Sequence, residues 1–173
     1  MDTIKPYEPQ SHYQKYLDLV PVGDIITIIQ EQQDAVVKIF QSVSNEKALY
    51  RYAPGKWSVK ELFGHLIDSE RIFSYRALCI GRHEKNPLPG WDQDDYIHNA
   101  NFDDQTIEEL INQFVIARMG FITLFQSFTT EALQNVGIAN SHHLSPRLIA
   151  RILFGHLVHH LNILRERYHI SIP

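Results

Sequence analysis

The sequence predicts an all-α protein folded as a four-helix bundle, and three observations support this prediction. Four long segments carry apolar residues at the three- and four-residue spacing of a helix that buries one face. Three of the four begin with an N-terminal capping signal. No strand-like alternation of comparable strength competes with them. We therefore expect residues 1–173 to form one domain, a length that is sufficient to bury a sizeable core.

The first predicted helix covers residues 24–43. Its apolar side chains recur three and four residues apart, as one buried helical face requires: Ile25, Ile28, Ile29, Val36, Ile39 and Phe40. The preceding residues 1–20 are rich in tyrosine, proline and polar groups. We expect them to wrap the bundle as an N-terminal arm, either extended or as a short helix.

The second predicted helix, residues 58–81, has the sharpest start. Ser58 is a natural N-cap, and Glu61 three residues later completes a capping box. Trp57 and Leu62 stand at the two positions of a hydrophobic staple, which fixes the direction in which the chain enters the helix.

A polar connection, residues 82–105, follows the second helix. Connections of this length are uncommon inside a compact domain and are often functional, so we expect a lid over the mouth of the bundle. Three aromatic side chains give this segment apolar surface: Trp91, Tyr96 and Phe102. Three aspartates could either approach a bound ion or cap a short helix that begins near residue 92: Asp92, Asp94 and Asp95.

The third predicted helix covers residues 106–128 and begins with a second capping box, formed by Thr106 and Glu109. A short helical turn is expected at residues 130–134. With two long connections in the chain, loop length alone does not determine the topology of the bundle.

The fourth predicted helix covers residues 145–168. Ser145 is a suitable N-cap, and Pro146 occupies the first turn, where its missing N–H is not needed.

Composition narrows the class of protein. Hydrophobic residues make up 44% and charged residues 21% of the chain, as in an ordinary globular protein. The net charge is −4 and no run of lysine and arginine occurs, which argues against a nucleic-acid partner. No signal peptide or membrane-spanning stretch is recognisable, so we expect a cytoplasmic protein. The single cysteine, Cys79, allows no intrachain disulfide and is expected to be a small buried hydrophobe.

Ten histidines are present, and three of them fall within residues 156–160. On a helical wheel, His156 and His160 lie near the centre of the apolar stripe, whereas His159 lies at its edge. Two inward imidazoles one turn apart are the arrangement by which one helix presents two nitrogens to one ion. His65, at the border of the apolar face of the second helix, could supply a third.

The sequence therefore makes His65, His156 and His160 the candidate metal ligands. Neutral imidazoles suit divalent Zn, Ni, Fe, Co or Mn, and three protein ligands leave one position open. Without a metal, each histidine could instead be a hydrogen-bonded helix residue. A zincin-type protease is disfavoured because Leu157 stands where that motif has glutamate. A di-iron carboxylate site is disfavoured because the chain lacks the required Glu-x-x-His motifs on two helices.

Three stretches resemble the DinB-like family of metal-binding four-helix bundles. Residues 57–71 (WSVKELFGHLIDSER) resemble its second-helix signature, and residues 155–160 (GHLVHH) resemble its last-helix motif. Residues 87–96 (PLPGWDQDDY) are similar to its middle stretch. The resemblance implies an up-down-down-up bundle that is often a homodimer. It also implies a divalent metal on three histidines, at positions that fall on His65, His156 and His160.

The resemblance leaves the reaction open, because some relatives are thiol transferases that use bacillithiol or mycothiol and many have no known activity. Our leading interpretation is a metal-dependent transferase that binds a low-molecular-weight thiol and a small-molecule substrate. A metal-dependent hydrolase is the alternative, and four acidic residues are its candidate acids or bases: Asp68, Glu61, Asp92 and Asp94. A non-catalytic metal-binding or dimerisation module would instead close the site with a fourth ligand such as His159 or Asp68.

Overall fold

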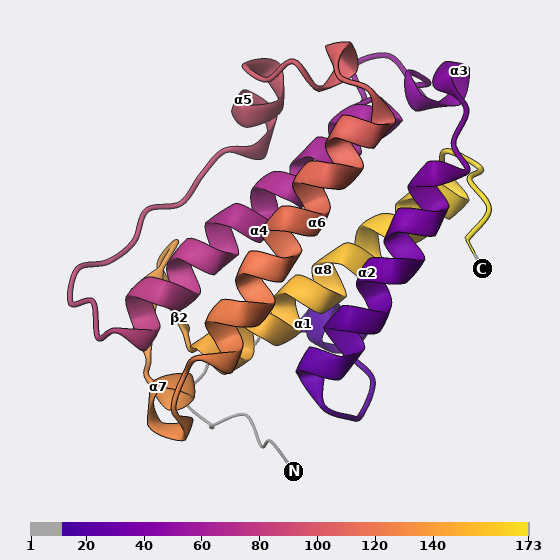
Figure 1. Ribbon diagram of the computed structural model, residues 1–173. Coiled ribbons are helices and arrows are strands. Elements are labelled where there is room, and N and C mark those ends of the chain that lie inside the picture. The colour runs from indigo at the N-terminus through magenta and orange to yellow at the C-terminus, as the bar shows by residue number, and fades with distance from the viewer. Residues whose placement is uncertain (1–11, 173) are drawn as a thin grey trace.

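The computed structural model describes residues 12–172, and its body is a bundle of four long helices (Figure 1). These are the four predicted helices, with bounds that differ by a few residues: α2 (Ile25–Gln41), α4 (Val59–Gly81), α6 (Ile107–Gln126) and α8 (Pro146–Glu166). The all-α, four-helix-bundle prediction is confirmed. None of the described helices is both long and apolar enough to cross a lipid bilayer.

The predicted capping signals set where the long helices begin. The Ser58 hydroxyl accepts a hydrogen bond from the Glu61 N–H at 3.0 Å, and the Glu61 carboxylate accepts one from the Ser58 N–H at 2.8 Å. Thr106 and Glu109 form the second capping box, and Ser145 caps α8 in front of Pro146. Each cap pairs backbone N–H groups that the first helical turn leaves without a partner.

The bundle has up-down-down-up topology (Figure 1). α2 and α8 run in one direction, and α4 and α6 run in the other. Because α4 and α6 are parallel neighbours, the chain must return along the whole bundle between them, which accounts for the long connection. That connection holds α5 (Gln93–His98) and the 3-10 helix η1 (Phe102–Asp104). The Lys60 ammonium donates to the Asp103 carbonyl at 2.9 Å, which joins the first turn of α4 to η1, shortly before α6 begins.

Four smaller elements lie in the connections from α2 to α4 and from α6 to α8. α3 (Asn45–Ala48) follows α2, and α7 (Thr130–Gln134) confirms the predicted helical turn. β1 (Gly137–Ala139) and β2 (His142–Leu144) form an antiparallel hairpin that the sequence analysis did not predict. Three residues per strand are too few to show alternation, so the sequence carries no strand pattern for this hairpin.

A buried polar network joins the four long helices at mid-height. Arg118 of α6 is fully buried, forms an ion pair with Glu70 of α4, and donates to the Gln32 side-chain oxygen of α2 at 3.0 Å. The Gln32 amide in turn donates to the Phe154 carbonyl of α8 at 3.1 Å. Buried charges are tolerated when paired and hydrogen-bonded, so this network constrains how the helices can pack.

The predicted N-terminal arm is represented by α1 (Gln14–Leu17), which packs against α8; residues 1–11 lie outside the described residues. The contact is made where α8 has a glycine. An added Cβ at Gly155 would lie 2.0 Å from the Tyr16 carbonyl oxygen. The missing side chain therefore lets the backbone of α1 approach the helix that carries His156 and His160.

Gly155→Ala is expected to lower the free energy of unfolding by about 1–3 kcal/mol, because the new methyl group must displace the backbone of α1. Gly120→Ala is the matched control, since nothing lies within 4 Å of that added Cβ on α6. Replacing an unstrained helical glycine by alanine stabilises a protein by about 0.5–1 kcal/mol. Urea denaturation would measure both variants. If both variants changed the free energy of unfolding in the same direction, the close approach of α1 to Gly155 would be contradicted.

Cys79 is half-buried on α4 and packs at the edge of the core. The expectation of a fully buried residue was therefore too strong, because the side chain lies where the apolar face of α4 meets its outer surface.

Candidate metal centre

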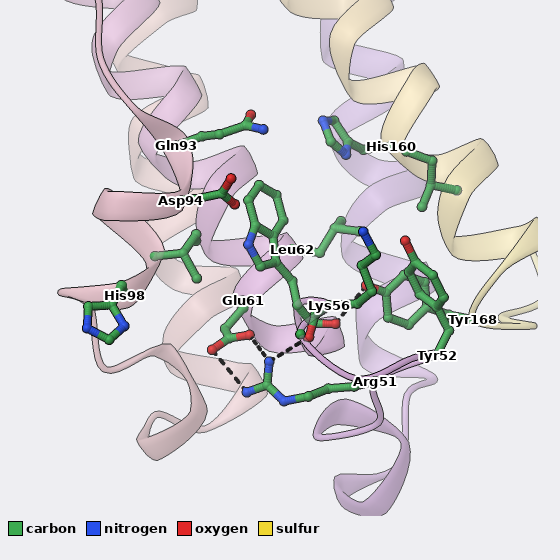
Figure 2. Close-up of a pocket in the computed structure, with 14 residues that line it drawn as sticks. Arg51, Tyr52, Lys56, Glu61, Leu62, Gln93, Asp94, His98, His160 and Tyr168 are labelled. Atoms are coloured by element: carbon green, nitrogen blue, oxygen red, sulfur yellow. Dashed lines mark hydrogen bonds and ion pairs between the residues drawn. The ribbon is translucent and has the colours of Figure 1, made fainter.

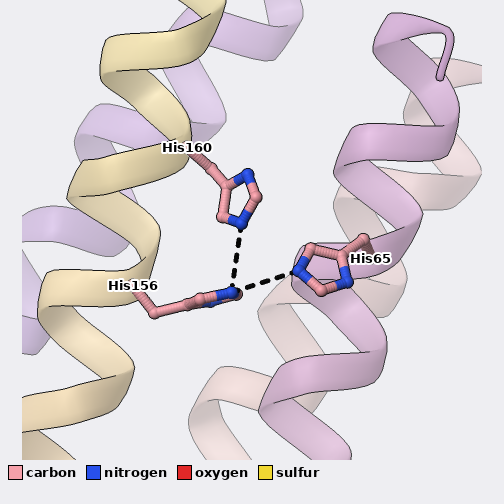
Figure 3. Close-up of side chains that lie close together, drawn as sticks. All are labelled: His65, His156 and His160. Atoms are coloured by element: carbon pink, nitrogen blue, oxygen red, sulfur yellow. Dashed lines mark hydrogen bonds between the residues drawn. The ribbon is translucent and has the colours of Figure 1, made fainter. Parts of the chain in front are cut away.

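The three predicted histidines meet in the bundle interior (Figure 3). His65 projects from α4, and His156 and His160 project from α8 one turn apart. The His156 Nε2 atom lies 3.1 Å from His65 Nε2 and 3.1 Å from His160 Nε2. One ligand atom from each residue lies within 4.8 Å of the other two. Nitrogens that share one ion at 2.0–2.1 Å lie about 3.3 Å apart in tetrahedral geometry, so the spacing suits a single metal.

All three imidazoles are buried. His65 is 1%, His156 7% and His160 8% exposed. The helical wheel predicts His65 at the border of the core, whereas the structure buries it, in contact with two histidine rings of α8 and two tryptophan rings. His159 is half-buried against the Tyr16 ring and is not one of the converging residues. A fourth histidine ligand is therefore absent from the cluster among residues 12–172.

Burial keeps the three imidazoles neutral. It lowers the pKa of His65 from 6.5 to about 4. Burial, and then the neighbouring histidines, hold the pKa values of His156 and His160 well below their usual range. Because metal ions bind the deprotonated imidazole, protons compete weakly for these nitrogens at neutral pH.

The hydrogen-bonding capacity of the cluster is not met by the protein alone. The His156 Nε2 atom faces two other ring nitrogens, and its single in-plane lone pair or N–H cannot serve both. The Nδ1 atoms of all three rings have no hydrogen-bond partner among the described residues. A cation between the three Nε2 atoms would pair the three Nε2 lone pairs at once, and these ring nitrogens therefore fit a metal ion.

Aromatic side chains surround the cluster. The ring centre of Trp57 lies 5.0 Å from that of His65, and the Trp91 ring stacks on the same imidazole at 5.5 Å with an interplanar angle of 18°. The Tyr16 ring meets the edge of His156 at 5.3 Å. Trp91 belongs to the segment expected to act as a lid, and it contacts the site directly. These rings limit access of water and fix the orientation of the imidazoles.

A pocket of about 700 Å³ opens beside the cluster, and His160 forms part of its wall (Figure 2). The loop before α4, the first turns of α4, helix α5 and the C-terminal half of α8 enclose it. Its volume suits a small organic molecule. The sequence gives no local sign that Arg51, Lys56 and Tyr168 line a pocket, because these residues come together only through the fold.

The four predicted acids and bases differ in their position and in their contacts: two line the pocket and two do not. Asp94 lines the pocket from α5. Glu61 also lines it, but its carboxylate is paired with Arg51 and with the start of α4. Asp92 caps α5 by accepting from the Asp94 N–H at 2.9 Å, and Asp68 forms an ion pair with a neighbouring arginine of α4. Asp94 is therefore the candidate with no competing side-chain partner among the described residues.

The metal-free protein is expected to lose stability as the pH falls from about 6.5 towards 4. The unfolded chain takes up protons on histidine below 6.5, whereas folded His65 takes up its proton only near 4. The lowered pKa of His65 alone reduces the free energy of unfolding by about 2 kcal/mol at pH 5. The lowered pKa values of His156 and His160 reduce it further. Urea denaturation at pH 7 and pH 5 would measure the loss. In His65→Leu the pH dependence should be shallower, and an unchanged slope would contradict the neutral buried state.

Comparisons with known proteins agree with this fold. The structure of YfiT from Bacillus subtilis is similar with a TM-score of 0.70, covering 99% of this chain and 93% of that chain at 13% sequence identity. It is described as "a probable metal-dependent hydrolase with an unusual four-helix bundle topology". No curated protein gives a significant match. Residues 28–164 match the sequence pattern of the DinB superfamily, and the chain belongs to that superfamily.

Proposed function

We propose that His65, His156 and His160 hold one divalent metal ion with a coordination position open towards the pocket, and that the protein is a metal-dependent enzyme for a small molecule. The observation that carries the proposal is the meeting of three buried, neutral imidazole nitrogens at metal-ligand spacing. An all-imidazole site suits Zn²⁺, Ni²⁺, Fe²⁺ or Co²⁺. A bound ion would supply Lewis-acid chemistry and lower the pKa of a water molecule or a thiol at the open position.

Two observations support hydrolysis as the reaction: the position of Asp94 in the pocket, and the description of YfiT as a probable metal-dependent hydrolase. A carboxylate in the pocket can orient a water molecule and accept its proton. The enclosing rings of Trp57 and Trp91 would keep other water away from the reacting atoms. Trp57 lines the pocket as well as contacting His65, so it would also contact the substrate.

Transfer of an exogenous thiol is the second version. The chain has one cysteine, and Cys79 is half-buried in a different part of α4 from His65. A reacting sulfur would therefore have to come from a low-molecular-weight thiol that enters the pocket. The pocket volume of about 700 Å³ has room for a thiol together with an electrophile.

To test the proposed metal dependence, the activity of the protein is measured before and after removal of the metal, in two assays. One assay measures hydrolysis of a panel of chromogenic esters and amides. The other measures conjugation of glutathione, cysteine or bacillithiol to 1-chloro-2,4-dinitrobenzene. We expect a chelator to abolish activity in one assay and Zn²⁺ or Co²⁺ to restore it. Activity that survives complete metal removal, or that is retained in His160→Ala, would contradict the proposal.

A further inference from the structure

The pocket beside His160 contains four charged side chains, and two of them are already neutralised. Arg51 forms ion pairs with Glu61, at 3.0 Å for one atom pair, and with Asp103 at 2.7 Å. Glu61 also accepts the Ser58 N–H within the capping box of α4. Arg51 and Glu61 thus stabilise the loop before α4 and offer a ligand little net charge.

The other two charged side chains of the pocket are Lys56 and Asp94. Within residues 12–172, neither side chain has an ion-pair or hydrogen-bond partner in the protein. Lys56 engages the protein through its backbone carbonyl, which accepts from Arg51 at 2.9 Å, and its ammonium group stays available. Asp94 likewise engages the Asp92 side chain through its backbone N–H at 2.9 Å.

These two charges come from different walls. Lys56 belongs to the loop that precedes α4, and Asp94 belongs to the first turn of α5 (Figure 2). In the same view, Gln93 and Asp94 project from α5 towards the side of the pocket that His160 lines. A ligand with one atom near His160 can therefore direct an anionic group to one wall and a cationic group to the other.

We propose that, in the thiol-transfer version, which needs no base at Asp94, the pocket selects zwitterionic small molecules, with Lys56 pairing a carboxylate or phosphate of the substrate and Asp94 pairing an amine. The inference rests on the proposed metal centre, which would hold the reacting end of the same molecule. Ion pairs of this kind in a partly open pocket are worth about 0.5–1.4 kcal/mol, or roughly a threefold to tenfold change in affinity.

The probes are three thiols of equal length that differ only at the far end: 6-mercaptohexanoate, 6-amino-1-hexanethiol and 6-mercapto-1-hexanol. Each is titrated into Co²⁺-loaded protein, and its affinity is read from the sulfur-to-cobalt charge-transfer band. We expect both charged probes to bind roughly three to ten times more tightly than the neutral alcohol. Lys56→Gln should remove the advantage of the carboxylate probe alone, and Asp94→Asn that of the amine probe alone.

Two control variants make the same changes of charge outside the pocket. Lys38→Gln and Asp34→Asn alter exposed side chains of α2, and they should leave all three affinities unchanged. Equal affinity of the three probes, or equal effects of pocket and control variants, would overturn the zwitterion proposal and leave the metal centre standing. Co²⁺ binding without a response to any thiol would overturn the open position. Failure to bind Co²⁺ would overturn the metal centre itself.

Discussion

Replacing Arg118 by methionine is expected to lower the free energy of unfolding by about 3–5 kcal/mol, because it leaves a buried carboxylate without its counter-charge. Arg118 and Glu70 are both almost completely inaccessible to solvent. Methionine keeps much of the apolar volume, so the loss measures the charge and its hydrogen bonds. Urea denaturation at pH 7 would give the value.

The loss in Arg118→Met should depend on pH. Burial already raises the pKa of Glu70, and the Arg118 charge opposes that rise. Without Arg118 the folded-state pKa rises further, so the variant should be most destabilised at high pH and recover as the pH falls and the carboxyl is protonated. A loss independent of pH between 5 and 8 would contradict this mechanism.

Two further variants serve as controls for the buried pair. Arg165→Ala removes one partner of an exposed ion pair at 3.9 Å, and should change the free energy of unfolding by less than about 0.5 kcal/mol. The double variant Glu70→Met, Arg118→Met removes both charges and should be more stable than Arg118→Met alone. If the double variant is the less stable of the two, the unpaired carboxylate is not the source of the loss.

Replacing His160 by alanine is expected to weaken the binding of Zn²⁺ or Co²⁺ by more than about 100-fold, since loss of a supporting residue alone commonly costs 10–100-fold. His159→Ala is the matched control, because it removes a neighbouring histidine of the same helix that does not join the cluster. Competition with a chromogenic chelator would measure both affinities. Equal losses would contradict the assignment of His160 as a ligand.

Much of the fold follows from short-range signals in the sequence. Ser58 with Glu61, and Thr106 with Glu109, are capping boxes that work within one helical turn, so sequence alone locates the starts of α4 and α6. The inward direction of His156 and His160 follows from the helical period in the same way. The crossing connection could be recognised as unusual in length, but its path along the bundle depends on the parallel pairing of α4 and α6.

The features that sequence analysis missed depend on contacts between distant segments. Nothing local distinguishes Arg118 from a surface arginine, and its partners Glu70 and Gln32 lie 48 and 86 positions away. The full burial of His65 depends on Trp91, which arrives from the long connection. In the sequence, nothing distinguishes Gly155 from any other glycine in a helix. Its role becomes visible only in the structure, where the backbone of α1 contacts it.

X-ray absorption spectroscopy of the Zn²⁺-loaded protein tests the central claim most directly. We expect one zinc per chain, three imidazole ligands with nitrogen at about 2.0–2.1 Å, and one further oxygen or nitrogen neighbour from outside the three histidines. The three-imidazole signal should persist in His159→Ala and fall to two in His65→Phe. A spectrum with fewer than three imidazoles in the unmodified protein, or one unchanged in His65→Phe, would contradict the three-histidine metal centre.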